Sequence, residues 1–200
     1  MIKAIIFDNG GVITSSDEKK ILHKLGIYLN VNGNDILKLR IKYSKQLCIG
    51  QINTEKFCNI LKEKFKIKKD IIKYYKKIYG EATIKNIDKD IFNIIIKLKK
   101  YYKVAMLSNA TDISVEQVKK IDLFSNFDVI ILSCEVGMNK PYKGIYKLLL
   151  KKLNLEPKEC IFIDDNLKNI NSAQKLGIKT IHFKNNKQLV KDLKKEGIKI

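Results

Sequence analysis

Near its N-terminus the chain reads Ile2-Lys3-Ala4-Ile5-Ile6-Phe7-Asp8-Asn9-Gly10-Gly11-Val12-Ile13. The apolar run from Ala4 to Phe7 stops at the carboxylate of Asp8, and two glycines follow almost at once. This pattern is typical of a buried parallel strand that ends at the carboxyl edge of a sheet and turns sharply. Because ligands of open α/β sheets bind outside that edge, Asp8 is a candidate catalytic carboxylate. Asp and Gly also favour turns for backbone reasons alone, so the rest of the chain must decide.

The composition predicts a globular protein with a packed core. The 200 residues are 45% hydrophobic and fit one large domain, or a core domain with a smaller one inserted. No apolar run has the length of a membrane span, and no signal region precedes the first strand. Scattered cysteines with few histidines favour a reduced, cytoplasmic protein over disulfides or zinc. The four cysteines are Cys48, Cys58, Cys134 and Cys160.

The net charge of +19 raises the question of nucleic-acid binding. Against it, Arg40 is the only arginine, so the planar fork that grips phosphates and guanine edges is nearly absent. Lysines recur at helical spacing, as in Lys97 to Lys100, which is typical of a solvated face. No helix-turn-helix, RRM or KH signature is present. We therefore predict that the protein binds neither nucleic acid nor membrane, and that its positive field attracts a small anionic substrate.

Residues 15–85 carry helical signals only. Ser15 and Glu18 form a capping-box pattern at the start of a first helix, which Gly26 is predicted to end. Gly80 is predicted to close the fourth helix at its C′ position. The second to fourth helices are predicted over residues 34–47, 53–65 and 70–79.

Four helices between the first strand and the next exceed the single crossover helix that joins parallel strands. We therefore expect an insertion, a small helical domain over the crevice. The predicted boundaries are residues 15–85 for this cap and residues 1–14 and 86–200 for the α/β core.

Beyond the insertion, strands and helices alternate. The strands are apolar without alternation, which predicts a parallel sheet covered on both faces. The expected fold is therefore α/β, a doubly wound, five-stranded parallel sheet with a helical cap inserted after the first strand. The later strands are predicted over residues 103–107, 128–132, 160–163 and 179–183, and the helices over 90–102, 114–121, 143–153, 167–176 and 187–195.

Three predicted strands end in polar residues at the same edge of the sheet. These ends are Asp8, Ser108-Asn109 and Asp164-Asp165. Three acidic groups meeting there would repel one another unless a cation lay among them, and carboxylate oxygens select Mg²⁺. Lys140 stands in a loop just before Pro141.

Each of these features also has a purely structural interpretation. Asp164-Asp165-Asn166 can cap the following helix, Ser108-Asn109 can form a polar turn, and Lys140-Pro141 can start a helix. Two adjacent carboxylates nevertheless exceed what a cap requires. Together the strand ends and the lysine offer a nucleophilic carboxylate, a metal site, a hydroxyl with an amide, and a cation, which phosphoryl transfer requires.

The same residues resemble the haloacid dehalogenase-like (HAD) hydrolase superfamily in four ordered motifs over nearly the whole chain. The helical insertion is similar to the cap of one large branch. Within that branch the chain looks most like small sugar-phosphate phosphatases such as glucose-1-phosphate phosphatases. The motifs are Phe7 to Val12, Leu107 to Asn109, Gly137 to Pro141 and Phe162 to Asn166, with a tail from Asn169 to Gly177.

The resemblance implies a Mg²⁺-dependent phosphatase that acts on a small phosphorylated substrate. Asp8 would be the nucleophile and form an aspartyl-phosphate that water hydrolyses. Mg²⁺ would bind Asp8, the Gly10 carbonyl and the Asp164-Asp165 pair. Which of the two adjacent acids is the inner-sphere ligand stays open.

The resemblance also implies how the phosphoryl group is held. Ser108 and the Asn109 amide would contact its oxygens, and Lys140 would neutralise charge on the phosphoryl group and the nucleophile. These assignments agree with the chemistry of the residues themselves.

The first motif departs from most family phosphatases, which carry a general acid–base aspartate where this chain has Gly10. Loss of such a group costs about 10²–10⁴-fold in rate. Some members of the branch also read Asp-x-Gly, so a phosphatase remains our preferred interpretation. The alternatives are a HAD-fold protein that binds a ligand or partner with little turnover and, third, a 2-haloacid dehalogenase. The Asp164-Asp165 pair disfavours the dehalogenase, because a metal-free site gains nothing from crowded carboxylates.

Overall fold

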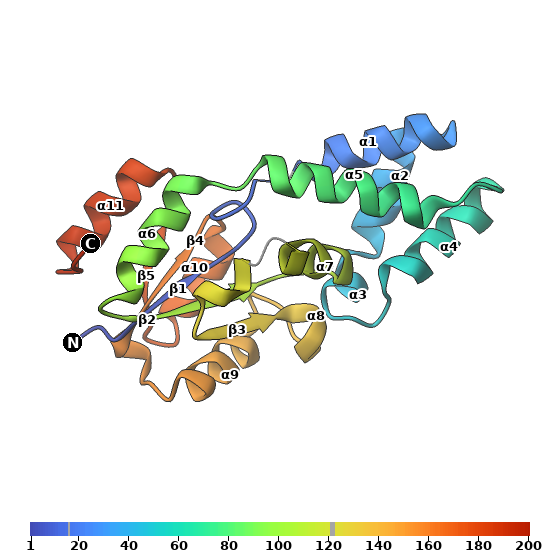
Figure 1. Ribbon diagram of the computed structural model, residues 1–200. Coiled ribbons are helices and arrows are strands. Elements are labelled where there is room, and N and C mark those ends of the chain that lie inside the picture. Colours follow the sequence, from blue (N-terminus) through green and yellow to red (C-terminus); the bar gives the residue numbers. More distant parts are fainter. Residues whose placement is uncertain (16, 121–122) are drawn as a thin grey trace.

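The protein is described from a computed structural model covering residues 1–15, 17–120 and 123–200. Its described strands form one five-stranded sheet in the order β3-β2-β1-β4-β5, and every pair is parallel. Figure 1 shows helices on both faces of this sheet, which confirms the predicted doubly wound α/β fold. The strands are β1 (Ala4–Phe7), β2 (Lys103–Ser108), β3 (Val129–Leu132), β4 (Cys160–Asp164) and β5 (Lys179–His182).

The unalternating apolar strands are explained by burial on both sides of the sheet. Ile5 and Phe7 face one hydrophobic cluster, whereas Ala4 and Ile6 face another, as the two-residue period of a strand requires. The first cluster is closed by α6 (Lys89–Lys99), α7 (Asp112–Lys120) and α11 (Asn186–Lys195), and the second by α9 (Lys143–Leu153) and α10 (Leu167–Gln174).

The central position of β1 brings the site together. Its neighbours are β2 on one side and β4 on the other, and Phe7 is level with Met106 and Ile163. The residues after Phe7 therefore lie beside the ends of both neighbouring strands. At this point the strand order reverses, because β2 and β3 follow on one side of β1 and β4 and β5 on the other. Crevices at such points are the usual ligand sites of doubly wound sheets.

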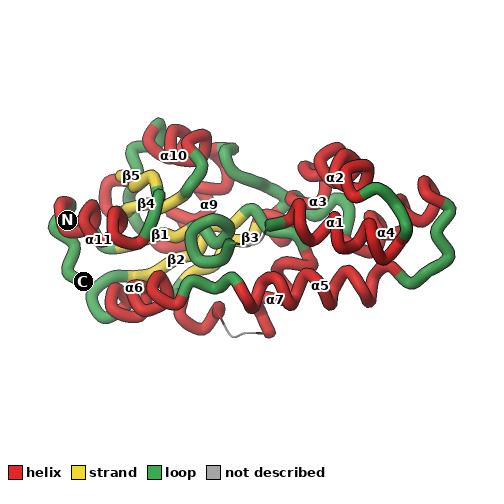
Figure 2. The backbone as a smooth tube through the Cα atoms, turned by 90° about the horizontal axis from the view of Figure 1, so that it is seen from above, coloured by secondary structure: helices red, strands yellow, loops and turns green. Residues whose placement is uncertain are grey.

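A helical unit, which we define as α1–α5, follows β1. These helices build a hydrophobic cluster of their own around Leu25, Phe57 and Leu61, to which α7 adds Ile113. Figure 2 shows the unit beyond one end of the sheet. The cap boundaries at residues 15 and 85 stay predictions. The helices are α1 (Glu18–Leu29), α2 (Gly33–Lys42), α3 (Ser44–Cys48), α4 (Thr54–Phe65) and α5 (Ile71–Lys85).

The predicted start of the first helix is wrong. Asp17, not Ser15, is the N-cap of α1, and its side chain accepts a hydrogen bond from the Lys20 amide at 3.1 Å. Ser15 lies outside the helix, and its amide donates a hydrogen bond to the Asn86 carbonyl at 3.0 Å. This bond lies beside the bridge between Thr14 and Ile87, where the two segments that connect the sheet with the helical unit run together. A tertiary contact thus overrides the local capping pattern.

Both glycines predicted to end helices lie inside them. α1 continues past Gly26 to Leu29, and α5 continues past Gly80 to Lys85. A Cβ on Gly26 would lie 2.6 Å from the Val31 carbonyl oxygen, and one on Gly80 would lie 2.5 Å from Oε1 of Gln117. The two glycines permit close packing of neighbouring segments and do not terminate the helices.

The single helix predicted over residues 34–47 is two helices, α2 and α3. The break is at Tyr43, which leaves helical geometry with φ −97° and ψ 6°. Its ring packs edge-on against Phe57 of α4, with the centroids 6.4 Å apart. The predicted end of the helix over residues 114–121 at Ile121 lies outside the described residues.

The remaining described elements are short connectors: η1 (Leu123–Asn126), α8 (Ser133–Val136) and η2 (Pro157–Glu159). No described helix is both long and apolar enough to cross a bilayer.

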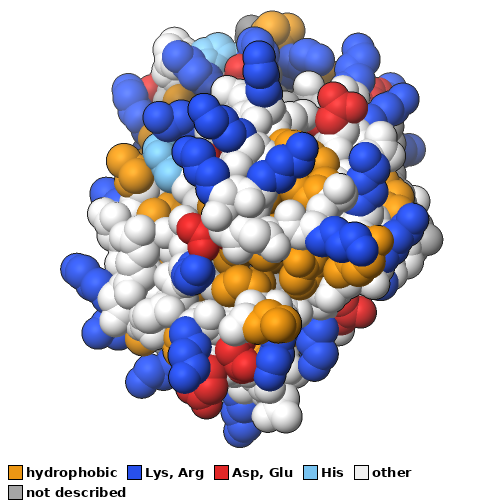
Figure 3. All heavy atoms as spheres, turned by 90° about the vertical axis from the view of Figure 1, so that its left-hand side faces the viewer, with side chains coloured by type: hydrophobic (Ala, Val, Ile, Leu, Met, Phe, Trp, Pro, Cys, Tyr) orange, Lys and Arg blue, Asp and Glu red, His pale blue; other side chains and the backbone are white. Residues whose placement is uncertain are grey.

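Lysine side chains cover much of the surface. Figure 3 shows them spread over the end of the core that carries α11, with uncharged and hydrophobic surface between them. This distribution is compatible with the solvated lysine faces expected from the sequence. The absence of a nucleic-acid partner stays a prediction.

Candidate active site

Asp8 stands where β1 meets the crevice. Its amide donates to the Ile163 carbonyl of β4 at 2.9 Å, and only 7% of the residue is exposed. Oδ1 accepts the Asn9 amide at 2.6 Å and lies 2.8 Å from Nζ of Lys140. Among the described residues, Oδ2 has no hydrogen-bond partner. One carboxylate oxygen is thus fixed and the other is available for chemistry.

The loop after Asp8 is a tight turn around one carbonyl. The Asn9 oxygen accepts the amides of Ile13 at 2.8 Å and Thr14 at 2.9 Å. Gly11 has φ +84°, and a Cβ there would collide with the Asp165 carboxyl group. At Gly10, by contrast, no described atom outside Gly10 and its two chain neighbours lies within 4 Å of the point where a Cβ would stand. Gly11 is therefore required by the backbone, whereas Gly10 leaves open space.

Lys140 lies between two carboxylates. Its ammonium is 2.8 Å from Oδ1 of Asp8 and 2.6 Å from Oδ2 of Asp164, and the residue is 2% exposed. Asn109 holds the backbone of this lysine in both directions, because its Oδ1 accepts the Lys140 amide at 2.8 Å and its Nδ2 donates to the Lys140 carbonyl at 3.0 Å. The side chain of Asn109 therefore positions Lys140.

Ser108, the last residue of β2, is buried and lines the cavity described below. The sequence places Ser108 and Asn109 together as phosphate contacts. The structure brings both to the crevice, but it engages the Asn109 side chain elsewhere. A contact of Asn109 with a phosphoryl group would therefore fall to its backbone amide.

Asp164 is fully buried and has a complete set of donors. Oδ1 accepts the Asn166 amide at 2.8 Å, and Nδ2 of Asn169 lies 3.1 Å from Oδ1 and 3.0 Å from Oδ2. Tyr146 in turn donates its hydroxyl to the Asn169 carbonyl at 3.1 Å. The helix cap is Asn166, whose side chain accepts the Lys168 amide, so neither acid serves as the cap.

Asn169 has no assigned role in the sequence interpretation. The available signal is its spacing, because a residue five positions after Asp164 lies in the first turn of α10, above the strand end. A lone Asn at this distance is too common to be assigned without the structure.

The three acids do converge. Ligand atoms from Asp8, Asp164 and Asp165 lie within 4.8 Å of one another. Burial raises the pKa of Asp8 to about 7, with the charge of Lys140 opposing the rise and that of Asp164 adding to it. Burial and Asp164 likewise raise the pKa of Asp165. Three carboxyls against one lysine leave an excess of negative charge, and an all-oxygen set of this kind suits Mg²⁺.

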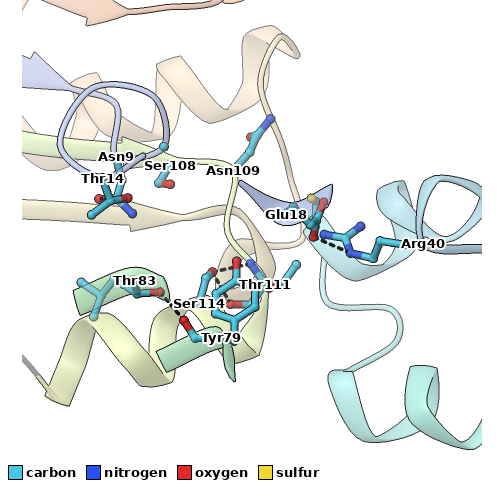
Figure 4. Close-up of a pocket in the computed structure, with 13 residues that line it drawn as sticks. Asn9, Thr14, Glu18, Arg40, Tyr79, Thr83, Ser108, Asn109, Thr111 and Ser114 are labelled. Carbon is cyan, nitrogen blue, oxygen red and sulfur yellow. Dashed lines mark hydrogen bonds and ion pairs between the residues drawn. The ribbon is translucent and has the colours of Figure 1, made fainter. Parts of the chain in front are cut away.

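A cavity of about 230 Å³ lies between the core and the helical unit, and Asn9 and Gly10, the two residues that follow Asp8, line it. The core contributes Gly10, Ser108 and Asn109, and the helical unit contributes Glu18 and Arg40. Figure 4 shows Asn9 and Ser108 on the core side of this cavity and Glu18 and Arg40 on the other side. The cavity thus has one end at the core, next to the residues that follow Asp8, and another end at the helical unit.

Glu18 and Arg40 are paired, with Nε of Arg40 2.9 Å from Oε1 of Glu18. Burial of the guanidinium is opposed by the charge of Glu18, and the pKa of Arg40 is raised overall. On the sequence alone, Arg40 serves only as evidence against nucleic-acid binding. Its isolation in a lysine-rich chain was the signal, but only the fold places it at the cavity.

The sequence profile of the haloacid dehalogenase-like hydrolases matches residues 2–177. The chain therefore belongs to this family of hydrolases, as its four motifs predict.

Individual relatives agree with this assignment. D-ribitol-5-phosphate phosphatase of Bacteroides thetaiotaomicron is 24% identical over 200 residues, which cover 92% of this chain and 93% of the relative. A HAD family enzyme of the same organism, solved in complex with magnesium and inorganic phosphate, is 26% identical with a TM-score of 0.79. That match covers 92% of this chain and 95% of the solved one.

Longer proteins also contain a region like this chain. Mouse acyl-CoA dehydrogenase family member 10 is 29% identical over 201 residues, which are 96% of this chain. The chain spans only 19% of the length of that relative.

Proposed function

We propose that the protein is a Mg²⁺-dependent phosphatase that hydrolyses a small phosphorylated metabolite of the sugar-phosphate class through an aspartyl-phosphate. The observation that carries this proposal is the constellation at the sheet edge. Among the described residues, Asp8 has one unpartnered carboxylate oxygen, Lys140 is fixed beside it, and two further acids lie within reach of a shared cation. The adjoining cavity of about 230 Å³ has room for a small leaving group.

In the proposed mechanism, Oδ2 of Asp8 attacks the phosphorus atom and the bond to the leaving oxygen breaks. Lys140 offsets negative charge on the phosphoryl group and on Asp8. Ser108 and the Asn109 amide hold the other phosphoryl oxygens. Water then attacks the phosphorus of the aspartyl-phosphate, which releases inorganic phosphate and restores the Asp8 carboxylate.

Mg²⁺ would supply charge neutralisation and orientation for the phosphoryl oxygens. We assign its site to Asp8, the Gly10 carbonyl and the Asp164-Asp165 pair. Within the pair, Asp165 is the better inner-sphere candidate. Every oxygen of the Asp164 carboxylate already accepts hydrogen bonds from Lys140, Asn166 or Asn169. The Asp165 carboxylate is exposed and, within the described part of the chain, accepts only from its own backbone amide.

Gly10 leaves the leaving group without a general acid from the first motif. A water in the open space beside Gly10 could donate the proton in place of this acid. Alternatively, the substrate has a leaving group that needs little protonation, so that no acid is required. Sugar 1-phosphates and acyl phosphates have leaving groups of that kind. The same gap favours a second candidate function, a HAD protein that binds a phosphorylated ligand with little turnover.

The similarity to a ribitol phosphate phosphatase, and to a solved enzyme holding magnesium and phosphate, supports the first candidate. We also propose the reducing cytoplasm as the compartment, because all four cysteines are free thiols.

A panel of phosphorylated metabolites tests the proposal directly. We expect phosphate release that requires Mg²⁺, stops in excess EDTA and falls by about 10⁴-fold or more in Asp8→Asn, where the nucleophile is removed. Asp35→Asn, an exposed acid on α2, is the control for a general effect of lost charge.

Two results would overturn it. Ligand binding without any turnover would favour the binding protein. Metal-independent halide release from a 2-haloacid would instead favour the dehalogenase.

A further inference from the structure

Glu18 and Arg40 form a fixed donor–acceptor pair at the end of the cavity opposite Asn9 and Ser108 (Figure 4). Arg40 is the only arginine among 40 basic residues, and at 9% exposure it is one of the few buried ones. Besides Lys140, it is the buried basic side chain of the described residues, and its planar donors suit a position where geometry matters as well as charge.

The pair has hydrogen-bonding capacity left over. The ion pair uses Nε of Arg40 and Oε1 of Glu18. Among the described residues, Oε2 of Glu18 has no hydrogen-bond partner, and its side chain remains 37% exposed. Arg40 also makes a side-chain hydrogen bond with Cys48, but its two terminal nitrogens carry more donors than this contact uses. An acceptor and several donors thus stand side by side, which matches a hydroxyl group, because a hydroxyl both donates and accepts.

The charge of the pair argues against a second anion at this position. Glu18 already neutralises Arg40, and its carboxylate would repel an approaching carboxylate or phosphate. The rest of the cavity lining is uncharged, and Thr111 and Ser114 contribute hydroxyl groups to it. The cavity therefore combines one anionic-group site at its core end with a neutral, hydroxyl-compatible site at the other.

We propose that the Glu18–Arg40 pair determines substrate specificity by binding hydroxyl groups at the end of the substrate far from the phosphate, and that Glu18 excludes substrates whose far end is a carboxylate. This inference rests on the proposed phosphatase function and narrows its substrate to esters of neutral polyols or sugars.

The test compares two esters of equal length that differ only at the far end. D-Ribitol 5-phosphate ends in a hydroxymethyl group, and D-ribonate 5-phosphate ends in a carboxylate. We expect the ratio of kcat/KM for the ribitol ester to that for the ribonate ester to exceed about tenfold, the size of one charge-assisted hydrogen bond.

Two variants should move this ratio in opposite directions. Glu18→Gln keeps the shape, removes the repelling charge and frees Arg40 to bind the carboxylate, so the ratio should fall by about tenfold. Arg40→Gln removes the positive charge that attracts the carboxylate and leaves Glu18 charged. The ratio should therefore rise, while kcat/KM falls for both esters. Asp35→Asn, which breaks the exposed 3.0 Å pair of Asp35 with Lys38 on α2, should leave the ratio unchanged.

A merely structural pair would give a different result. Loosening of α1 against α2 would lower kcat/KM for both esters by the same factor in both variants, and this outcome would overturn the inference. A ratio near one in the unaltered protein would overturn it as well.

p-Nitrophenyl phosphate separates this inference from the function on which it rests. If Mg²⁺-dependent hydrolysis of this aryl ester occurs without a preference between the two pentose esters, only the inference fails. If none of the three esters is hydrolysed, the proposed function fails with it.

Discussion

The edge of the sheet and the helical unit face each other across one cavity, but they are built in different ways. At the sheet edge, Asp8 and Asp164 stand where buried strands end, and each carboxylate is held by hydrogen bonds or ion pairs from neighbouring segments. On the helical side, Glu18 and Arg40 are held by one ion pair between α1 and α2, with a further contact from Arg40 to Cys48. The hydrophobic cluster of these helices is separate from the two beside the sheet.

This difference indicates a division of labour. Phosphoryl transfer requires reacting atoms held to a fraction of an ångström, which strands in a packed sheet provide. The leaving group can be recognised by side chains of the helical unit, because its helices pack on one another and their residues can be substituted without disturbing the acids. Substitutions at the sheet edge should therefore lower stability and turnover. Substitutions on the helical side should instead change the selectivity between substrates.

The largest effect on stability is expected for Lys140→Met. The substitution leaves Asp8 and Asp164 without their buried counter-charge, so the free energy of unfolding in EDTA should fall by about 3–5 kcal/mol. Denaturant titration measures it, and Lys147→Met on the exposed face of α9 should change it by less than about 0.5 kcal/mol. Equal stability of the two variants would contradict the central role of Lys140.

Gly10→Asp tests whether the reactive groups lack only an acid. No described atom outside Gly10 and its two chain neighbours lies within 4 Å of a Cβ at this position, so the side chain has room. We expect an increase in kcat of up to about 100-fold on alkyl phosphates, whose leaving groups need a proton, and a smaller one on p-nitrophenyl phosphate.

Gly10→Asn, of equal size but without an acid, should give no increase. A correctly folded Gly10→Asp protein with unchanged or lower rates would show that the missing acid does not limit turnover.

Asn169→Ala probes the support of the acids. Loss of the amide that contacts both oxygens of Asp164 should lower the free energy of unfolding by about 1.5–3 kcal/mol. The Mg²⁺ concentration for half-maximal activity should rise by about 10–100-fold, as expected when a group behind a ligand is removed. Asn171→Ala, an exposed neighbour on α10, is the control. An unaltered Mg²⁺ dependence would separate Asn169 from the metal site.

The last prediction concerns the pH dependence of stability. Because the pKa of Asp8 is raised from 3.8 to about 7, the folded state holds its proton more tightly than the unfolded state does. Ionisation of Asp8 therefore lowers the free energy of unfolding of the metal-free protein as pH rises from 3.8 to about 7. Above about pH 7 this decrease is complete. Asp8→Asn should remove this part of the pH dependence in thermal unfolding measured in EDTA. The same slope in both proteins would show that Asp8 ionises normally.

The sheet, and the convergence of Asp8, Ser108 and Asp164 at its edge, could be predicted from the amino-acid sequence alone. Apolar strands that stop at Asp8, Ser108 and Asp164 require burial on both faces, and parallel strands bring such ends to one edge. These features are legible because each is encoded locally, by a run of apolar residues and the polar residue that ends it.

The neighbour that each group takes depends instead on the tertiary structure. Asn109 holds the backbone of Lys140, Asn169 holds Asp164, and Arg40 stands with Glu18 at the far end of the cavity. The helix ends predicted at Gly26 and Gly80 are wrong for the same reason. Hydrogen bonds and close packing between segments distant in sequence leave no periodic pattern in the chain, so they become visible only when the fold brings their partners together.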